Sequence, residues 1–96
     1  MIKNKIVIEE QVLNFIRRQP PEARRRIREA LHEVENDTAY PQPLEDELEG
    51  FYKLKIDRIR IILQSESGGE GPVLKAVFAE RRSVVYEIFK QILSLE

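Results

Sequence analysis

Apolar residues recur along this chain at two different spacings, and the change between them separates helical from extended segments. Residues 5–9 read Lys-Ile-Val-Ile-Glu, a β-branched run that predicts a short strand. Residues 9–18 carry apolar side chains three and four positions apart, which predicts an amphipathic helix. A second helix is predicted over residues 20–35, because Pro20 and Pro21 fit a first helical turn and an apolar stripe follows them.

The spacing changes to two in the second half of the chain, where apolar and charged residues alternate. A tight turn at Asp57 and a Gly-rich connection over residues 66–72 interrupt this alternation. The pattern therefore predicts an antiparallel meander of three strands, over residues 51–56, 58–63 and 73–79.

A last helix is predicted over residues 84–93, where helical spacing returns and Ser83 is expected to be the N-cap. Residues 39–43 contain two prolines and are expected to form a loop. The predicted fold class is α+β: a small antiparallel β-meander plus an N-terminal edge strand, packed on two N-terminal helices, with a short C-terminal helix. Residues 1–96 are expected to form one domain, since this length leaves room for one core.

The two faces of the predicted meander differ in chemistry. One face is apolar, includes Phe78, and is expected to pack against the helices. The other face gathers positive charge from all three strands, at Lys53, Lys55, Arg58, Arg60 and Lys75. Continued alternation along the third strand places Arg81 on the same face. A solvated sheet face is often rich in Lys, but like charges on neighbouring strands repel each other, so solubility alone would favour interleaved acids. The pattern therefore favours a surface for phosphates and bases, flanked by Phe51 and Tyr86.

Composition narrows the classes of function. The chain has 16 Lys and Arg residues against 17 Asp and Glu residues, and its formal net charge of −1 excludes a generally basic nucleic-acid binder. The net charge is −3 over residues 1–50 and +2 over residues 51–96. We therefore expect one basic and one acidic surface.

Several kinds of site are excluded by residue type. The chain has no Cys and one His, which excludes a thiolate zinc site, a Cys nucleophile and a two-His acid/base pair. No apolar run approaches the length of a membrane span, and no signal peptide is recognised at the start. The expected compartment is the cytoplasm, with no membrane partner, no metal and no cofactor.

Three segments together resemble the RelE branch of the RelE/ParE toxins of bacterial toxin–antitoxin systems. They read LEGFYKLK at residues 48–55, RIRIILQ at residues 58–64 and VFAERRSVVY at residues 77–86. The family pattern is a Leu-x-Gly turn, a Tyr-x-(Leu/Ile)-(Arg/Lys) strand, a Tyr/Ile-Arg strand and a basic residue shortly before Val-Tyr. The order and spacing of these motifs carry the resemblance, since each motif alone is weak.

The resemblance implies a RelE-like fold and a ribosome-dependent mRNA endoribonuclease, or mRNA interferase, that inhibits translation without a metal. In such enzymes the 2′-hydroxyl of the RNA attacks the adjacent phosphate and leaves a 2′,3′-cyclic phosphate and a 5′-hydroxyl. This chemistry needs a base, cationic stabilisation of the phosphorane and an acid. The implied partners are a cognate antitoxin, the ribosome and mRNA.

The resemblance also implies roles for five residues. Lys53 and Lys55 match the paired strand lysines, with Lys55 as the base, and Arg60 matches the arginine that stabilises the transition state. Arg81 matches the arginine that stabilises charge or protonates the leaving group, although Arg82 fits the same position within one residue. Tyr86 matches the aromatic residue that stacks on or orients an mRNA base. Further expected RNA contacts are Arg24, Arg25, Arg28, Arg58, Lys75 and Arg82, of which the first three fit equally well a solvated helix face.

Two other functions fit the same fold, because fold alone does not decide function. The first is a ParE-like, non-catalytic inhibitor of DNA gyrase, which the near-neutral charge mildly favours. The second is an inactivated toxin-fold module that only binds a partner. The lysine pair with Arg60, Arg81 and Tyr86 favours the nuclease, since a gyrase inhibitor does not need that set.

Overall fold

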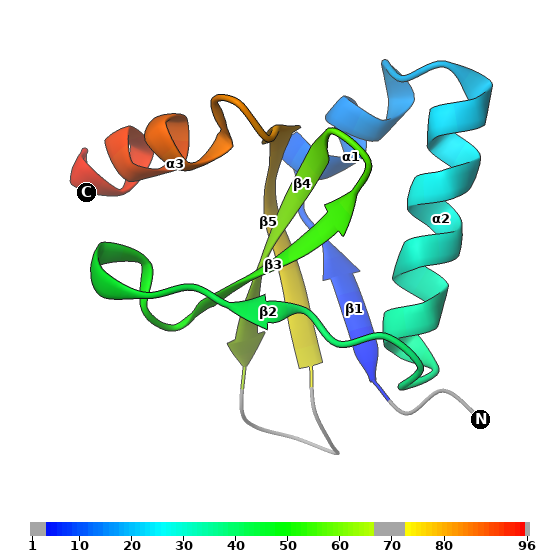
Figure 1. Ribbon diagram of the computed structural model, residues 1–96, viewed down its shortest axis with the longest axis horizontal. Helices are drawn as coiled ribbons and strands as arrows, with labels where there is room; N and C mark the ends of the chain where they lie inside the picture. The colour runs from blue at the N-terminus through cyan, green and yellow to red at the C-terminus, as the bar shows by residue number, and fades with distance from the viewer. Residues whose placement is uncertain (1–3, 67–72, 96) are drawn as a thin grey trace.

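The computed structural model describes residues 4–66 and 73–95 and is built on a five-stranded sheet in the order β1-β5-β4-β3-β2 (Figure 1). Strands β3, β4 and β5 form the antiparallel meander, and β1 lies parallel to β5 at one edge. The predicted α+β fold class is confirmed by this arrangement. The strands are β1 (Lys5–Ile8), β2 (Gln42–Pro43), β3 (Phe51–Ile56), β4 (Ile59–Glu66) and β5 (Val73–Arg81). The helices are α1 (Glu10–Arg17), α2 (Pro21–Glu35), the 3₁₀ turn η1 (Asp46–Leu48) and α3 (Val85–Ser94).

The main core lies between one face of the sheet and the two N-terminal helices. Val12 of α1 and Ile27 of α2 are fully buried against Leu54, Ile61 and Leu63 of the meander. Each such aliphatic side chain contributes about 1.5–3 kcal/mol when it is removed from water. The predicted helical stripes thus form the interface that their spacing indicates.

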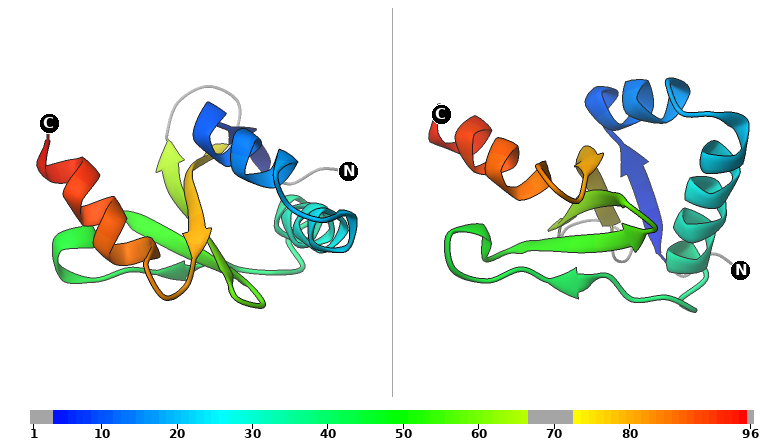
Figure 2. Two further views of the ribbon diagram at one scale, coloured as in Figure 1. Left: turned by 90° about the horizontal axis from the view of Figure 1, so that it is seen from above. Right: turned by 45° about the horizontal axis from the view of Figure 1, so that its top comes forward.

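The opposite face of the sheet is also covered, in part, by α3. Figure 2 shows α3 on one side of the sheet and α1 with α2 on the other. Here Ile62 and Phe78 are buried with Val85 and Phe89 in a second, smaller cluster. The Phe51 ring packs edge-on against Phe89, at 5.0 Å between centroids. The prediction that Phe51 flanks an open binding face is therefore wrong, because its ring belongs to this second core.

A β-bulge in β5 changes which side chains share a face. Ile62 pairs with Phe78 while Leu63 pairs with Ala76, so Val77 has no partner on β4. Val77 and Phe78 both lie on the α3 side, whereas simple alternation places Phe78 against α1 and α2. Beyond the bulge the parity is reversed, and Arg81 lies opposite Ile59 on the side of α1 and α2. The prediction that Arg81 shares the face of the other cations is therefore wrong.

Smaller differences concern the ends of elements. Ser83 does not cap α3, whose N-cap is Val84 with no side-chain hydrogen bond. The segment expected to be a loop over 39–43 contains β2, where Pro43 is tolerated because the strand lies at a sheet edge. The predicted Leu-x-Gly turn is present: Gly50 has a φ of 96°, which glycine adopts without steric cost. Of the Gly-rich connection expected at 66–72, residues 67–72 lie outside the described residues.

Candidate functional site

Lys53 and Tyr86 form the centre of the candidate site. The Lys53 ammonium lies over the Tyr86 ring, with 5.9 Å from Nζ to the ring centroid. Lys53 comes from β3 and Tyr86 from the first turn of α3, and both side chains are half-buried. The Tyr86 ring also packs against the second core, so its body is held while part of it stays exposed. A cation over an aromatic face is stabilised by about 0.5–1 kcal/mol at such a site.

Lys55 and Arg60 are direct partners in the β3–β4 ladder, two positions along β3 from Lys53. Directly opposed residues of an antiparallel pair lie on the same face of the sheet, so two cations are adjacent here. One guanidinium nitrogen of Arg60, Nη1, donates to the backbone oxygens of Asp57 at 2.8 Å and Ile59 at 2.9 Å. These bonds hold Arg60 over the β3–β4 turn, and within residues 4–66 and 73–95 its other guanidinium nitrogens have no hydrogen-bond partner.

Lys55 extends over the edge of the sheet beside α2. Its side chain is exposed and lines a groove of about 360 Å³ that also contains Glu29, Glu33 and Asp57. The edge is open at this point because β2 pairs only with Tyr52 and Lys53. Lys55 thus pairs with Arg60 in the β3–β4 register, while its side chain lines the groove beside α2.

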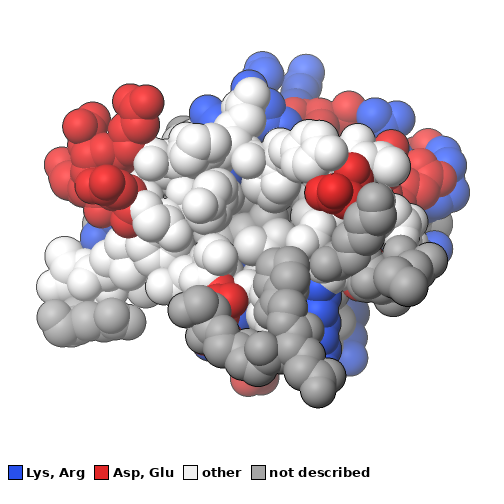
Figure 3. Space-filling view, turned by 90° about the horizontal axis from the view of Figure 1, so that it is seen from below, with Lys and Arg blue, Asp and Glu red and all other residues white. Residues whose placement is uncertain are grey.

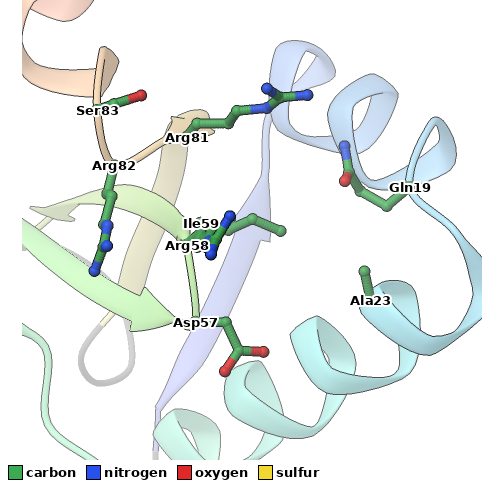
Figure 4. Close-up of a pocket in the computed structure, with 8 residues that line it drawn as sticks. All are labelled: Gln19, Ala23, Asp57, Arg58, Ile59, Arg81, Arg82 and Ser83. Carbon is green, nitrogen blue, oxygen red and sulfur yellow. The ribbon is translucent and has the colours of Figure 1, made fainter.

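Arg81 and Arg82 lie at the end of β5 and extend in different directions. Figure 4 shows Arg81 directed toward the side of α1 and Gln19, and Arg82 turned away from them. The Arg82 N–H donates to the backbone oxygen of Arg58 at 2.7 Å, so the β4–β5 pairing continues by one more pair. In this register Arg82 falls on the same face of the sheet as Arg60, and Arg81 falls on the opposite face. The five predicted catalytic residues do not share one cleft, because Arg81 lies on the other side of the sheet.

Glu80 is a residue of this face that sequence reasoning missed. It pairs directly with Arg60 in the β4–β5 register and is half-buried. One carboxylate oxygen accepts a hydrogen bond from the Arg81 N–H at 2.8 Å. In the sequence Glu80 directly precedes two arginines, which marks it as a candidate site residue. The face of the sheet on which it lies depends on the bulge in β5.

Four of the other predicted RNA-binding residues are in ion pairs or lie away from Lys53 and Tyr86. Lys75 pairs with Glu66 at 3.0 Å, and the hydrogen bond to Glu66 raises the pKa of Lys75. Arg25 bonds Glu22 at 2.6 Å and Glu29 at 2.7 Å, and the Glu22 hydrogen bond raises its pKa further. These contacts match a solvated helix face for Arg25. Arg28 lines a small groove between α2 and β1, and Arg24 is half-buried on α2.

Charge is unevenly distributed over the surface. Figure 3 shows acidic side chains gathered at the left end of the molecule, where the loop containing η1 lies in Figure 1. The acids of this loop are exposed, at Glu45, Asp46, Glu47 and Glu49. Lys90 of α3 lies 4.0 Å from Glu47, while the arginines at the β3–β4 turn lie at the other end of β3. The predicted acidic surface is present, whereas Figure 3 shows Lys and Arg intermixed with other acidic side chains at the right of the molecule.

No helix within residues 4–66 and 73–95 has the length and apolar character needed to cross a membrane. Within the same ranges, no three acidic or His side chains converge as metal ligands would.

Two solved structures share this fold. A YoeB/ParE toxin from Agrobacterium tumefaciens superposes with a TM-score of 0.61 at 16% identity, covering 80% of this chain and 97% of the toxin. The toxin–antitoxin complex RelBE2 from Mycobacterium tuberculosis gives a TM-score of 0.57 at 16% identity, with coverage of 86% and 95%. Neither a protein-family model nor a curated protein matches the sequence. The chain therefore has the fold of RelE/ParE-like toxins, as the sequence resemblance predicted.

Proposed function

We propose that this chain is the toxin of a toxin–antitoxin pair and that it cleaves mRNA on the ribosome. The observation that supports this most is the placement of the Lys53 ammonium over the Tyr86 ring, beside the adjacent pair of Lys55 and Arg60. These four residues occupy the motif positions that resemble the nuclease branch of the fold family. A surface with a cation, an aromatic ring and a fixed guanidinium suits a phosphate next to an unstacked base.

In the proposed reaction the RNA supplies its own nucleophile. Lys55 takes the proton of a 2′-hydroxyl once its flexible side chain turns from the α2 groove toward Arg60, and the 2′-oxygen attacks the adjacent phosphorus. The bond from phosphorus to the 5′-oxygen breaks, and the Lys53 ammonium gives that oxygen a proton. The products are a 2′,3′-cyclic phosphate and a 5′-hydroxyl.

Arg60 and Arg82 stabilise the negative charge that develops on the phosphorane. Two peptide oxygens already position Arg60, so little reorganisation is needed when the charge appears. Arg82 rather than Arg81 has the matching parity in the β4–β5 register, which supports Arg82 for this role. Arginine stays protonated at neutral pH, so both side chains act as fixed charges rather than as acids.

Tyr86 positions the base next to the cleaved phosphate. Lys53 covers one face of the ring, and the exposed part of the ring offers a stacking surface to a splayed base. Stacking on an aromatic side chain contributes about 1–3 kcal/mol per base. The proposal includes a cognate antitoxin as partner and the cytoplasm as compartment, supported by the similarity to a toxin–antitoxin complex.

The test is mRNA cleavage in a reconstituted translation reaction, with the new ends mapped by primer extension. We expect cleavage only when ribosomes are present, and loss of cleavage in the double variant Lys55→Ala with Arg60→Ala. The control is Lys5→Gln, which removes one exposed positive charge at the far end of β1. Intact mRNA with inhibition of gyrase supercoiling would overturn the nuclease in favour of the ParE-like function, and intact mRNA without it would favour a binding module.

A further inference from the structure

A wide cleft lies at the end of the sheet and extends from the β3–β4 turn to the side opposite Tyr86. It has a volume of about 710 Å³ and lies between the α1–α2 connection and the β3–β4 turn. Figure 4 shows its lining, which includes the three arginines Arg58, Arg81 and Arg82 together with Gln19 and Ile59. The half-buried Ile59 gives the cleft an apolar floor.

The arginines of this cleft are available to a ligand. Within residues 4–66 and 73–95, no ion pair and no side-chain hydrogen bond involves the guanidinium of Arg58, Arg81 or Arg82. The one carboxylate in the lining is Asp57, and Arg26 already binds both of its oxygens, at 2.6 and 2.8 Å. The cleft therefore has an excess of positive charge next to an apolar surface.

The cleft is continuous with the proposed active face around the end of the sheet. Arg58 lies in the two-residue turn between Ile56 and Ile59, and its backbone oxygen accepts the Arg82 N–H. Arg60 is held over the same turn through its bond to the Asp57 oxygen. Guanidinium groups thus follow one another from Arg60 on one side, past the turn, to Arg81 on the other.

We propose that this cleft binds the backbone of single-stranded RNA, with Arg58 and Arg81 on successive phosphates. A strand that places one base at Tyr86 then passes the β3–β4 turn and enters the cleft. The regularly spaced phosphates of such a strand match the row of guanidinium groups in the cleft. The apolar surface of Ile59 accommodates a sugar or a base edge. Arg81 thereby acts as an RNA-positioning residue and not as a catalytic one. The proposal rests on RNA as the substrate class of the proposed function, but it concerns binding and not cleavage.

The test measures binding of an RNA that cannot be cleaved. The probe is a fluorescein-labelled single-stranded oligonucleotide made with 2′-O-methyl ribose, which lacks the free 2′-hydroxyl. We expect Arg81→Gln to weaken its binding about tenfold, since a charge-assisted contact to phosphate is lost. We also expect the slope of log K against log salt to fall by about 0.7, the value for one phosphate contact to a single strand. The control is Lys5→Gln, which removes one exposed charge outside the cleft.

A second measurement locates the strand. Amide NMR shifts of Ala23 and Ile59, which line the cleft, should move when the oligonucleotide is added to the wild-type chain and should need about tenfold more oligonucleotide to move as far in Arg81→Gln. Equal affinities and equal salt slopes for wild type and Arg81→Gln would overturn the proposal, and would favour an acidic peptide as the occupant. Failure of the nuclease function gives a different result, because binding would persist while mRNA on ribosomes stayed intact.

Discussion

The Lys53 ammonium lies 5.9 Å from the centre of the Tyr86 ring, so β3 and α3 both contribute to the candidate site. These residues are far apart in the sequence, and packing of α3 on the sheet brings them together. Phe89, one turn along α3 from Tyr86, contacts Phe51 and stacks on Phe78 at 5.7 Å between centroids. The second core therefore positions the aromatic member of the site.

Two replacements of Tyr86 distinguish the role of its aromatic ring from the role of its hydroxyl. Tyr86→Ala is expected to lower kcat/KM for mRNA cleavage by about 5- to 150-fold, because stacking contributes about 1–3 kcal/mol per base. Tyr86→Phe keeps the ring and its contact with Lys53, and is expected to stay close to wild type. Single-turnover cleavage on stalled ribosomes measures both variants. A full loss of activity in Tyr86→Phe would show that the hydroxyl, and not the ring, does the chemistry.

Arg60 is expected to act in the transition state. Arg60→Ala should lower kcat by about 10²–10³-fold with little change in KM, as does removal of a preorganised group aimed at developing charge. Arg60→Lys keeps one positive charge, but a lysine does not reproduce the planar fork that bonds two peptide oxygens and an anion. It should recover only part of the rate. An effect of Arg60→Ala confined to KM would contradict the assigned role.

Glu80 offers a competing base on the same face, opposite Arg60. If Lys55 is the base, Glu80→Gln should change kcat by less than about threefold, well under the 10²–10⁴-fold that a positioned acid or base supplies. The measurement is kcat against pH for wild type and Glu80→Gln. A loss of 10²-fold or more, together with disappearance of the acidic limb of the wild-type profile, would assign the base to Glu80.

The second core is expected to contribute substantially to stability. Phe89→Ala should lower the free energy of unfolding by about 3–5 kcal/mol, because it removes a buried ring that contacts two others. Urea denaturation followed by circular dichroism measures this change. The matched variant Arg25→Gln removes only an exposed ion-pair residue and should stay within about 1 kcal/mol of wild type. Equal stabilities of the two variants would mean that α3 does not pack as described.

The ion pair of Lys75 and Glu66 predicts a pH dependence of stability. The hydrogen bond to Glu66, and the negative charges of Glu66 and Glu9, raise the pKa of Lys75 above its ordinary 10.5. The folded chain thus holds this proton more tightly than the unfolded chain. The stabilisation is fully present below pH 10.5 and is lost as the pH rises through the raised folded-state value. Denaturation midpoints between pH 9 and pH 12 should converge for wild type and Lys75→Met; a constant difference would contradict this.

Much of the fold follows from spacing in the sequence. The change from steps of three and four to steps of two separates helices from strands, and Pro20 with Pro21 mark the boundary between two helices. The apolar stripe of α3 predicts that this helix packs against the sheet. It does not predict which face of the sheet the helix covers. Contacts distant in sequence, such as Phe51 with Phe89, decide this.

The site was predicted less completely, and the bulge at Val77 is the physical reason. One extra residue on β5 reverses the parity beyond it, and the continuous apolar run from Ala76 to Ala79 conceals the insertion. Arg81 is therefore displaced from the predicted face and Glu80 is brought onto it. Lys53 and Tyr86 were predicted as site residues and lie together, because β3 is regular at Lys53 and α3 packs back onto the sheet.

The central claim is that the 2′-hydroxyl of the message attacks its own phosphate at this site. The most direct measurement compares two mRNAs on ribosomes, one all-ribose and one with a single 2′-deoxynucleotide before the cleaved phosphate. The proposed function predicts cleavage of the first message, with a 2′,3′-cyclic phosphate and a 5′-hydroxyl at the new ends, and no cleavage at that position in the second. Equal cleavage of both messages, or an intact all-ribose message, would contradict it.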